Sequence, residues 1–135
     1  MSFTPYIHFQ GNCREAMTRY AEIFGAKLNI ITYNDAPEGQ TVPRSDRVMH
    51  SDILTETGSL LMASDFPEGM EGAPQAAVTI SRIVDTEPEG RDVFGQLSEG
   101  GTVIVDYGPT YWSQGFGMLK DRFGTHWMVM VATDG

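Results

Sequence analysis

The residues of this chain that could carry out chemistry are its three histidines, His8, His50 and His126, and its single cysteine, Cys13. A neutral imidazole can act as a general base or as a metal ligand. No close pair of the HExxH or CxxC kind accompanies the histidines, so they could form only a non-standard metal site. Each could equally be a hydrogen-bonded structural histidine, and the residues alone leave both interpretations open.

Cys13 falls within a predicted amphipathic helix. Asn12 can cap the helix N-terminus with Glu15 returning the bond, and apolar residues follow at spacings of three and four. Gly25 can supply the left-handed conformation that ends the helix. Because Cys13 lies on the apolar stripe, we expect a packed, unreactive thiol rather than a nucleophile.

The first half of the chain also has the pattern of four strands. Residues 3–9 and 28–32 flank the helix and alternate loosely, and residues 48–54 and 59–63 are predicted as two further strands. The segment 34–46 is rich in Asp, Pro, Gly, Glu and Ser and is predicted to be a long loop. The first half therefore has the order strand, helix, strand, strand, strand.

The same order is predicted again in the second half. Residues 76–83 form a predicted strand, and Thr86 with Glu89 has the capping-box spacing ahead of a second helix. A strand follows around residues 103–105, and a hairpin occupies residues 111–131. Sequence identity between the halves is negligible, so the repeat is one of pattern.

The hairpin stretch combines an aromatic loop with a strand that is apolar on both faces. Trp112 and Phe116 belong to the loop side, Gly124 can take a positive φ in the turn, and Met128 lies in the last strand. Such a strand must be covered on both faces, so one face should meet a helix and the other should line a core or a pocket. The eight methionines as a set could simply be core.

Composition excludes several classes of partner. The 135 residues carry a net charge of −9 with no basic patch, which argues against binding to nucleic acid or to an anionic membrane. The start has no signal-peptide pattern, and no segment approaches the roughly 20 apolar residues that span a bilayer. A single cysteine agrees with a reducing compartment. We therefore expect a cytoplasmic protein.

Motifs spread over nearly the whole chain resemble one known family. They are Pro5, Tyr6, Phe9, Gly11, Glu15, Ala16, Tyr20, 23–26, His50, 62–65, Trp112, 115–117, 121–124 and Trp127. With the repeated element order, they resemble the vicinal oxygen chelate superfamily of glyoxalase I, extradiol dioxygenases and the fosfomycin and bleomycin resistance proteins. The closer match is its PhnB-like branch, also labelled as a 3-demethylubiquinone-9 3-methyltransferase domain.

The resemblance implies an α+β fold with two βαβββ modules curled around a shared cleft. Residues 1–135 would form a single domain, with module 1 at about 1–66 and module 2 at about 75–135. The resemblance also implies that the fold is completed as a homodimer.

The superfamily's chemistry uses a divalent metal held by His and Glu, and this chain lacks those residues at the matching positions. Counting back from the first helix, the usual first-strand histidine falls at Pro5, and the usual last-strand glutamate falls at Met128. Neither side chain suits a hard or borderline cation, so we expect no metal. Successive strand residues point to opposite faces. His126 is two residues from Met128 and should face the cleft, whereas His8 is three residues from Pro5 and should face the helix layer.

We expect no cofactor either. The methyltransferase label would need a glycine-rich loop between a first strand and a helix, whereas Gly115-Phe116-Gly117 precedes a strand. Nucleophile elbows and Walker-type phosphate loops are absent from the sequence as well.

The predicted function is binding of an apolar or aromatic small molecule in the cleft. The expected contacts are Phe9, His50, Met62, Trp112, Phe116, His126 and Met128. The alternative is an enzyme, lyase, isomerase or dioxygenase-like, that uses His50 or His126 as a general base or in a non-standard metal site.

Overall fold

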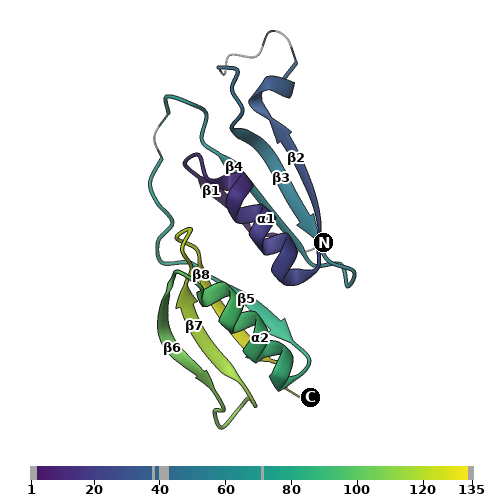
Figure 1. Ribbon diagram of the computed structural model, residues 1–135, viewed down its shortest axis with the longest axis vertical. Helices are drawn as coiled ribbons and strands as arrows, with labels where there is room; N and C mark the ends of the chain where they lie inside the picture. Colours follow the sequence, from purple (N-terminus) through teal and green to yellow (C-terminus); the bar gives the residue numbers. More distant parts are fainter. Residues whose placement is uncertain (1–2, 38, 40–42, 71, 134–135) are drawn as a thin grey trace. The chain divides into compact units, whose positions relative to one another are not determined.

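The structure is a computed structural model of the chain and describes residues 3–37, 39, 43–70 and 72–133. The chain divides into two compact units, Met1–Pro74 and Gln75–Gly135. Each unit has one long helix and a four-stranded sheet (Figure 1). Within the described residues, no helix is long and apolar enough to cross a membrane.

The first unit contains a sheet with the strand order β1-β4-β3-β2. Its elements are β1 (Tyr6–Phe9), α1 (Cys13–Phe24), β2 (Lys27–Thr32), the short 3-10 helix η1 (Tyr33–Asp35), β3 (Val48–Leu54) and β4 (Leu60–Asp65). Strand β1 is parallel to β4, and the other pairs are antiparallel. The loop predicted at 34–46 begins with η1, and its residues 38 and 40–42 lie outside the described residues.

The second unit repeats this topology with the order β5-β8-β7-β6. Its elements are β5 (Thr79–Val84), α2 (Glu87–Ser98), β6 (Thr102–Gly108), β7 (Phe116–Lys120) and β8 (His126–Val131). Strand β5 is parallel to β8. The predicted order of strand, helix, strand, strand, strand in each half is therefore confirmed, and the α+β class with it.

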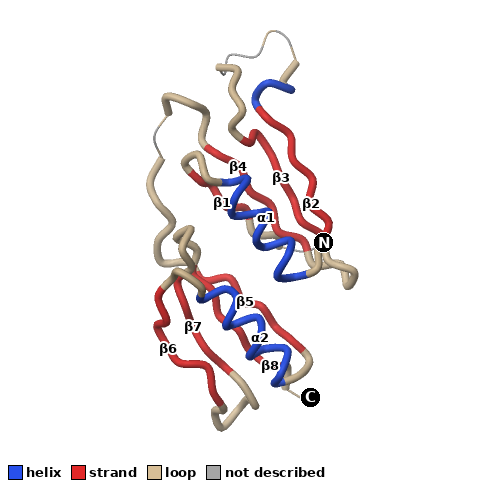
Figure 2. The backbone as a smooth tube through the Cα atoms, in the orientation of Figure 1, coloured by secondary structure: helices blue, strands red, loops and turns tan. Residues whose placement is uncertain are grey.

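In each unit the helix lies along one face of its sheet (Figure 2), and the core is between them. The core residues of the first unit include Cys13, Ala16, Met17 and Tyr20 of α1, Ile7 and Phe9 of β1, and Ser51 and Ile53 of β3. In the second unit they include Val93, Phe94 and Leu97 of α2, and Trp127, Val129 and Val131 of β8. Alternate strand residues point away from the helix, and we call that side of each sheet its far face.

The helix ends follow the sequence signals with one exception. Gly25 ends α1 at φ 61°, and the Thr86 side chain accepts a hydrogen bond from the Glu89 amide at the start of α2. The prediction that the Asn12 side chain caps α1 was wrong, because this side chain makes no capping hydrogen bond. Instead, the Cys13 amide donates to Asp65 Oδ1 at 3.0 Å, from a strand 52 residues away. A tertiary contact thus replaces the local cap.

Candidate functional site

The far face of the first sheet carries a row of polar side chains. Strand pairing places Tyr6 beside Met62, Met62 beside Asp52, and Asp52 beside Asn29, so one row crosses all four strands. His50 lies one row away, since it is two residues from Asp52 on β3. Because strand residues two apart share a face, His50 and Asp52 point to the same side.

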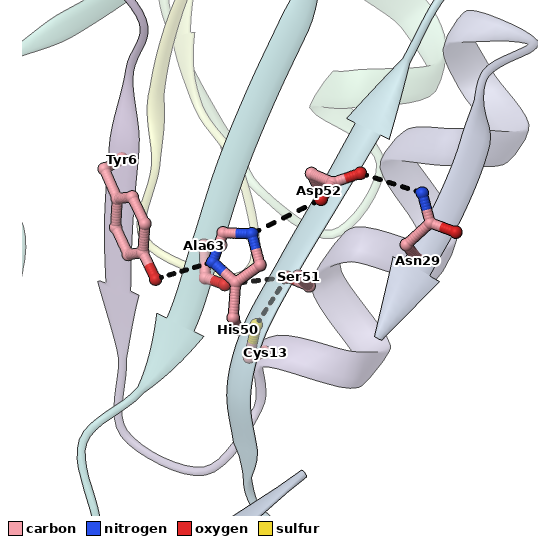
Figure 3. Close-up of polar contacts among 7 residues, drawn as sticks. All are labelled: Tyr6, Cys13, Asn29, His50, Ser51, Asp52 and Ala63. Carbon is pink, nitrogen blue, oxygen red and sulfur yellow. Dashed lines mark hydrogen bonds and ion pairs between the residues drawn. The ribbon is translucent and has the colours of Figure 1, made fainter. Parts of the chain in front are cut away.

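These residues form a hydrogen-bonded chain, which we call the Tyr6 chain: Tyr6, His50, Asp52 and Asn29 (Figure 3). The Tyr6 hydroxyl is 3.0 Å from His50 Nδ1. His50 Nε2 is 3.3 Å from Asp52 Oδ2, and the Asn29 amide donates to Asp52 Oδ1 at 3.0 Å. The Tyr6 ring spans β4 to reach β3, so the contact joins residues 44 apart in sequence.

The partners of His50 set the tautomer of its ring. An ionised carboxylate can only accept hydrogen bonds, so Nε2 carries the proton that Asp52 accepts. In the neutral ring, Nδ1 is then the acceptor for the Tyr6 O–H. This arrangement leaves an oxygen lone pair of Tyr6 unused by the chain, and Tyr6 is 40% exposed.

His8 also lies on the far face of the first sheet, so its expected position toward the helix layer was wrong. Its Nδ1 is 3.3 Å from Ser64 Oγ, its ring is 5.1 Å from that of Tyr6, and it stacks on Phe66 at 5.4 Å. The neighbouring Phe9 faces α1 and is only 3% exposed, so it does not reach the far face. The expected parity was counted from Pro5, which precedes β1, whereas within β1 Tyr6 and His8 are the exposed residues and Ile7 and Phe9 the buried ones.

Asp65 fixes the backbone around the Tyr6 chain from the helix side. Its carboxylate is 2% exposed and accepts hydrogen bonds from the amides of Gly11, Cys13 and Val48, at 2.8, 3.0 and 2.9 Å. These amides belong to the turn after β1, the start of α1 and the start of β3. One buried carboxylate therefore holds together the two strands that supply Tyr6 and His50.

The opposite side of β3 holds Cys13 in a separate contact. Its Sγ is 3.4 Å from Ser51 Oγ, and Ser51 donates to the Ala63 carbonyl (Figure 3). Burial raises the pKa of the Cys13 thiol to about 12, above its ordinary value of 9.0. Cys13 is fully buried, which confirms the expected packing. Nucleophilic chemistry needs the thiolate, so the low reactivity of this thiol stays a prediction.

The far face of the second sheet is mainly apolar. Pairing between β7 and β8 places Phe116 beside Met130 and Met118 beside Met128, and Trp112 lies edge-on to Phe116 at 5.5 Å. His126 shares this face beside Lys120, and its buried Nδ1 has no hydrogen-bond partner among the described residues. This face suits packing or apolar contact.

The predicted contacts therefore separate into two groups. His50 and Met62 lie together on the far face of the first sheet, and Trp112, Phe116, His126 and Met128 belong to the second unit. The shared cleft that would join the groups stays a prediction. Tyr6, Asp52 and Asn29 were not among the contacts predicted from the sequence. His50 and Asp52 at alternate positions of a predicted strand were the signal that could have found Asp52.

The residues do not fit the metal centre that the superfamily implies. Among the described residues, no group of three or more His, Cys, Asp or Glu side chains could hold a metal ion. Pro5 precedes β1, and Met128 offers only a thioether. The absence of a metal stays a prediction.

Nor do Gly115, just before β7, and Gly117, within β7, fit a cofactor loop. A Cβ at Gly115 would lie 2.1 Å from the Tyr107 hydroxyl, and one at Gly117 would lie 2.6 Å from the Phe94 ring. Both glycines therefore allow close packing inside the second unit, whereas a cofactor loop would present them to a ligand.

Comparison with solved structures identifies the fold of this chain. A glyoxylase/bleomycin resistance protein/dioxygenase domain from Frankia sp. EAN1pec superposes with a TM-score of 0.64 at 11% identity, covering 98% of this chain and 97% of that one. At this identity the likeness shows the fold alone. With two four-stranded sheets, each covered by one helix, the chain has the glyoxalase fold of the vicinal oxygen chelate superfamily.

The family follows from closer matches. The chain belongs to the 3-demethylubiquinone-9 3-methyltransferase family, whose model matches residues 1–130. It is similar to protein PA1353 from Pseudomonas aeruginosa, with 36% identity, a TM-score of 0.89 and 99% of each chain covered. It is also similar to the putative 3-demethylubiquinone-9 3-methyltransferase, PhnB protein, from Bacillus cereus, with 25% identity, a TM-score of 0.72, and 98% and 100% covered. The predicted PhnB-like branch is confirmed.

Proposed function

We propose that this chain binds a small organic molecule on the far face of its first sheet. The observation that carries the proposal is the Tyr6 chain, a continuous set of hydrogen bonds on a solvent-exposed surface. The side chains of His50 and Asp52 are 34% and 26% exposed. Exposed polar contacts contribute only about 0–1 kcal/mol each to folding, so stability alone does not account for the chain.

The surroundings of the Tyr6 chain support an aromatic or otherwise flat ligand. Met62 lies in the same row, between Tyr6 and Asp52, and Ile31, which is 43% exposed, lies beside His50. A thioether and a branched alkyl group offer apolar contact next to directed polar groups, which is the usual composition of a ligand site.

Catalysis is the second candidate function, and the hydrogen bonds of His50 favour it over His126. A carboxylate that orients one ring nitrogen leaves the other as a base, which is the arrangement of a general-base histidine. Transfer of a methyl group is not part of the proposal, because Gly115 and Gly117 serve packing within the second unit.

Thermal-shift screening of quinones and substituted benzenes, followed by amide NMR titration of each hit, tests the binding proposal. We expect perturbed amides in β1, β3 and β4, and loss of the thermal shift in Met62→Lys. The matched control is Met70→Lys, which adds the same charge at an exposed loop position. Perturbations confined to β7 and β8, or an unchanged shift in Met62→Lys, would contradict a site on the first sheet.

A further inference from the structure

We propose that the Tyr6 chain is a proton relay that takes the proton of an acidic hydroxyl on the ligand, a phenol or an enol, and holds the ligand as its anion. This inference rests on the proposed function and adds the ligand class and the role of each residue. Tyr6 touches the ligand, His50 is the final proton acceptor, and Asp52 and Asn29 are positioning residues.

The geometry places Tyr6 between the ligand and the base. Its hydroxyl is 3.0 Å from His50 Nδ1, and its side chain is among the exposed ones of the unit. In the neutral state the Tyr6 O–H is directed at Nδ1, so toward a ligand the oxygen can only accept. The site in this state selects a ligand group that donates, and a hydroxyl is such a group.

The proton balance of the relay is closed within the site. The ligand O–H bond breaks and its proton forms a new O–H bond on Tyr6. At the same time the original Tyr6 O–H bond breaks, and that proton forms an N–H bond on His50 Nδ1. The ligand becomes an oxyanion that accepts a hydrogen bond from Tyr6, and His50 becomes an imidazolium. No oxidant, reductant or second substrate is needed, and reversal returns the proton.

The residues behind His50 stabilise the charged state. Asp52 already accepts from Nε2, so the imidazolium forms next to a carboxylate. Asn29 holds the other carboxylate oxygen at 3.0 Å and keeps the acceptor oriented. Of the titratable groups in these two rows of the far face, His8 of β1 is the remaining one. The other residues of these two rows, Ile31, Met62 and Ser64, have no acidic or basic side chain.

The test uses 4-nitrophenol, whose phenolate is coloured, and nitrobenzene, which has the same body without the hydroxyl. Binding to the full chain is measured at a pH where the free nitrophenol is mostly un-ionised. We expect the phenolate-to-phenol ratio of the bound probe to exceed that of the free probe at least about tenfold, equivalent to one pKa unit. Nitrogen NMR should show His50 Nδ1 gaining a proton in the complex.

Tyr6→Phe and His50→Gln remove the relay and should return the bound probe to the phenol form while nitrobenzene binding persists. Asp52→Asn should lower the phenolate ratio and the protonation of Nδ1, a change that a purely structural role would not produce. Tyr111→Phe is the matched control, since it deletes the hydroxyl of a fully exposed tyrosine in the second unit. Melting curves of each variant verify folding.

The outcomes separate the two proposals. Bound nitrophenol with no excess of phenolate, or an excess retained in Tyr6→Phe, would overturn the relay while leaving the binding proposal in place. If neither nitrophenol nor nitrobenzene bound and the compound screen also gave no hit, the binding proposal would fail and the relay with it. An excess that disappears in both Tyr6→Phe and His50→Gln supports both.

Discussion

At the scale of single residues, β3 separates two kinds of polar contact. On its helix side, Ser51 and Cys13 meet in a buried contact, and Asp65 binds three amides nearby. On its far side, His50 and Asp52 are half-exposed members of the Tyr6 chain. The buried polar groups lose their hydrogen bonds to water when the chain folds, and their partners in the protein replace those bonds and so stabilise the fold. The partly exposed groups remain available to a ligand.

Asp65→Asn should destabilise the first unit by about 2–3 kcal/mol, since an amide nitrogen would replace one accepting oxygen opposite backbone N–H donors. Urea denaturation measures the change. Asp92→Asn is the control, because Asp92 is exposed on α2 and its change should remain within about 0.5 kcal/mol. Equal stability of the two variants would refute the role given to Asp65.

Cys13 should make stability depend on pH in the alkaline range. Its pKa is about 12 in the folded chain against an ordinary value of 9.0, so only the unfolded chain loses this proton between those values. The contribution of the raised Cys13 pKa to the free energy of unfolding is fully present below pH 9.0 and is lost as the pH rises toward about 12. The measurement is the unfolding free energy of the wild type minus that of Cys13→Ala, which cancels the other titrating groups.

We expect that difference to be flat below pH 9.0 and to fall above it. Ellman's reagent should likewise react slowly with the folded protein and quickly in urea. Rapid reaction of the folded protein at pH 8 would show that Cys13 is reachable and ionisable, against the burial found here.

At the scale of elements, close approach within the second unit depends on particular glycines. A Cβ at Gly90 of α2 would lie 2.5 Å from the Tyr107 hydroxyl and 3.1 Å from Val84, whereas one at Gly95 of the same helix would meet nothing within 4 Å. Tyr107 cannot easily move away, because its hydroxyl donates to the Glu87 carbonyl. The two positions therefore differ in packing although both are helical.

Gly90→Ala should destabilise the protein by about 1–3 kcal/mol through overpacking, and Gly95→Ala should stabilise it by about 0.5–1 kcal/mol through helix propensity. The pair controls for propensity, because both changes add one methyl group to α2. Denaturation midpoints provide the measurement, and changes of the same sign at both positions would contradict the close approach of Tyr107.

At the scale of the whole molecule, the edge strand β6 carries three consecutive exposed apolar residues. Val103, Ile104 and Val105 are 43%, 52% and 41% exposed, and β6 ends the strand order of its sheet. An exposed apolar edge is a template for association, which natural proteins usually cover. The occupant that we propose is a second copy of this chain.

Light scattering at micromolar concentration should give twice the chain mass of 14.9 kDa. Ile104→Lys should shift the protein to the monomer mass, because a charge at the covered edge would be desolvated without a partner. Val78→Lys, at an exposed position before β5, is the matched control and should remain dimeric. A wild-type monomer would rule out the homodimer.

The sequence by itself determined the order of the elements and several of their ends. Periodicity located both helices and the strands, and Gly25 and Thr86 marked helix ends because their signals act within a few residues. The apolar position of Cys13 predicted its burial for the same local reason.

Tertiary structure decided which side chains meet. The face of His8 depended on where β1 begins and on how it pairs with β4, because a change of one residue in register reverses the two faces of a strand. The group that caps α1 is the carboxylate of Asp65, which is 52 residues from the Cys13 amide that it binds. The Tyr6 hydroxyl that contacts His50 is 44 residues away from it in sequence. Contacts across that separation are set by strand order and register, which hydrophobic periodicity does not encode.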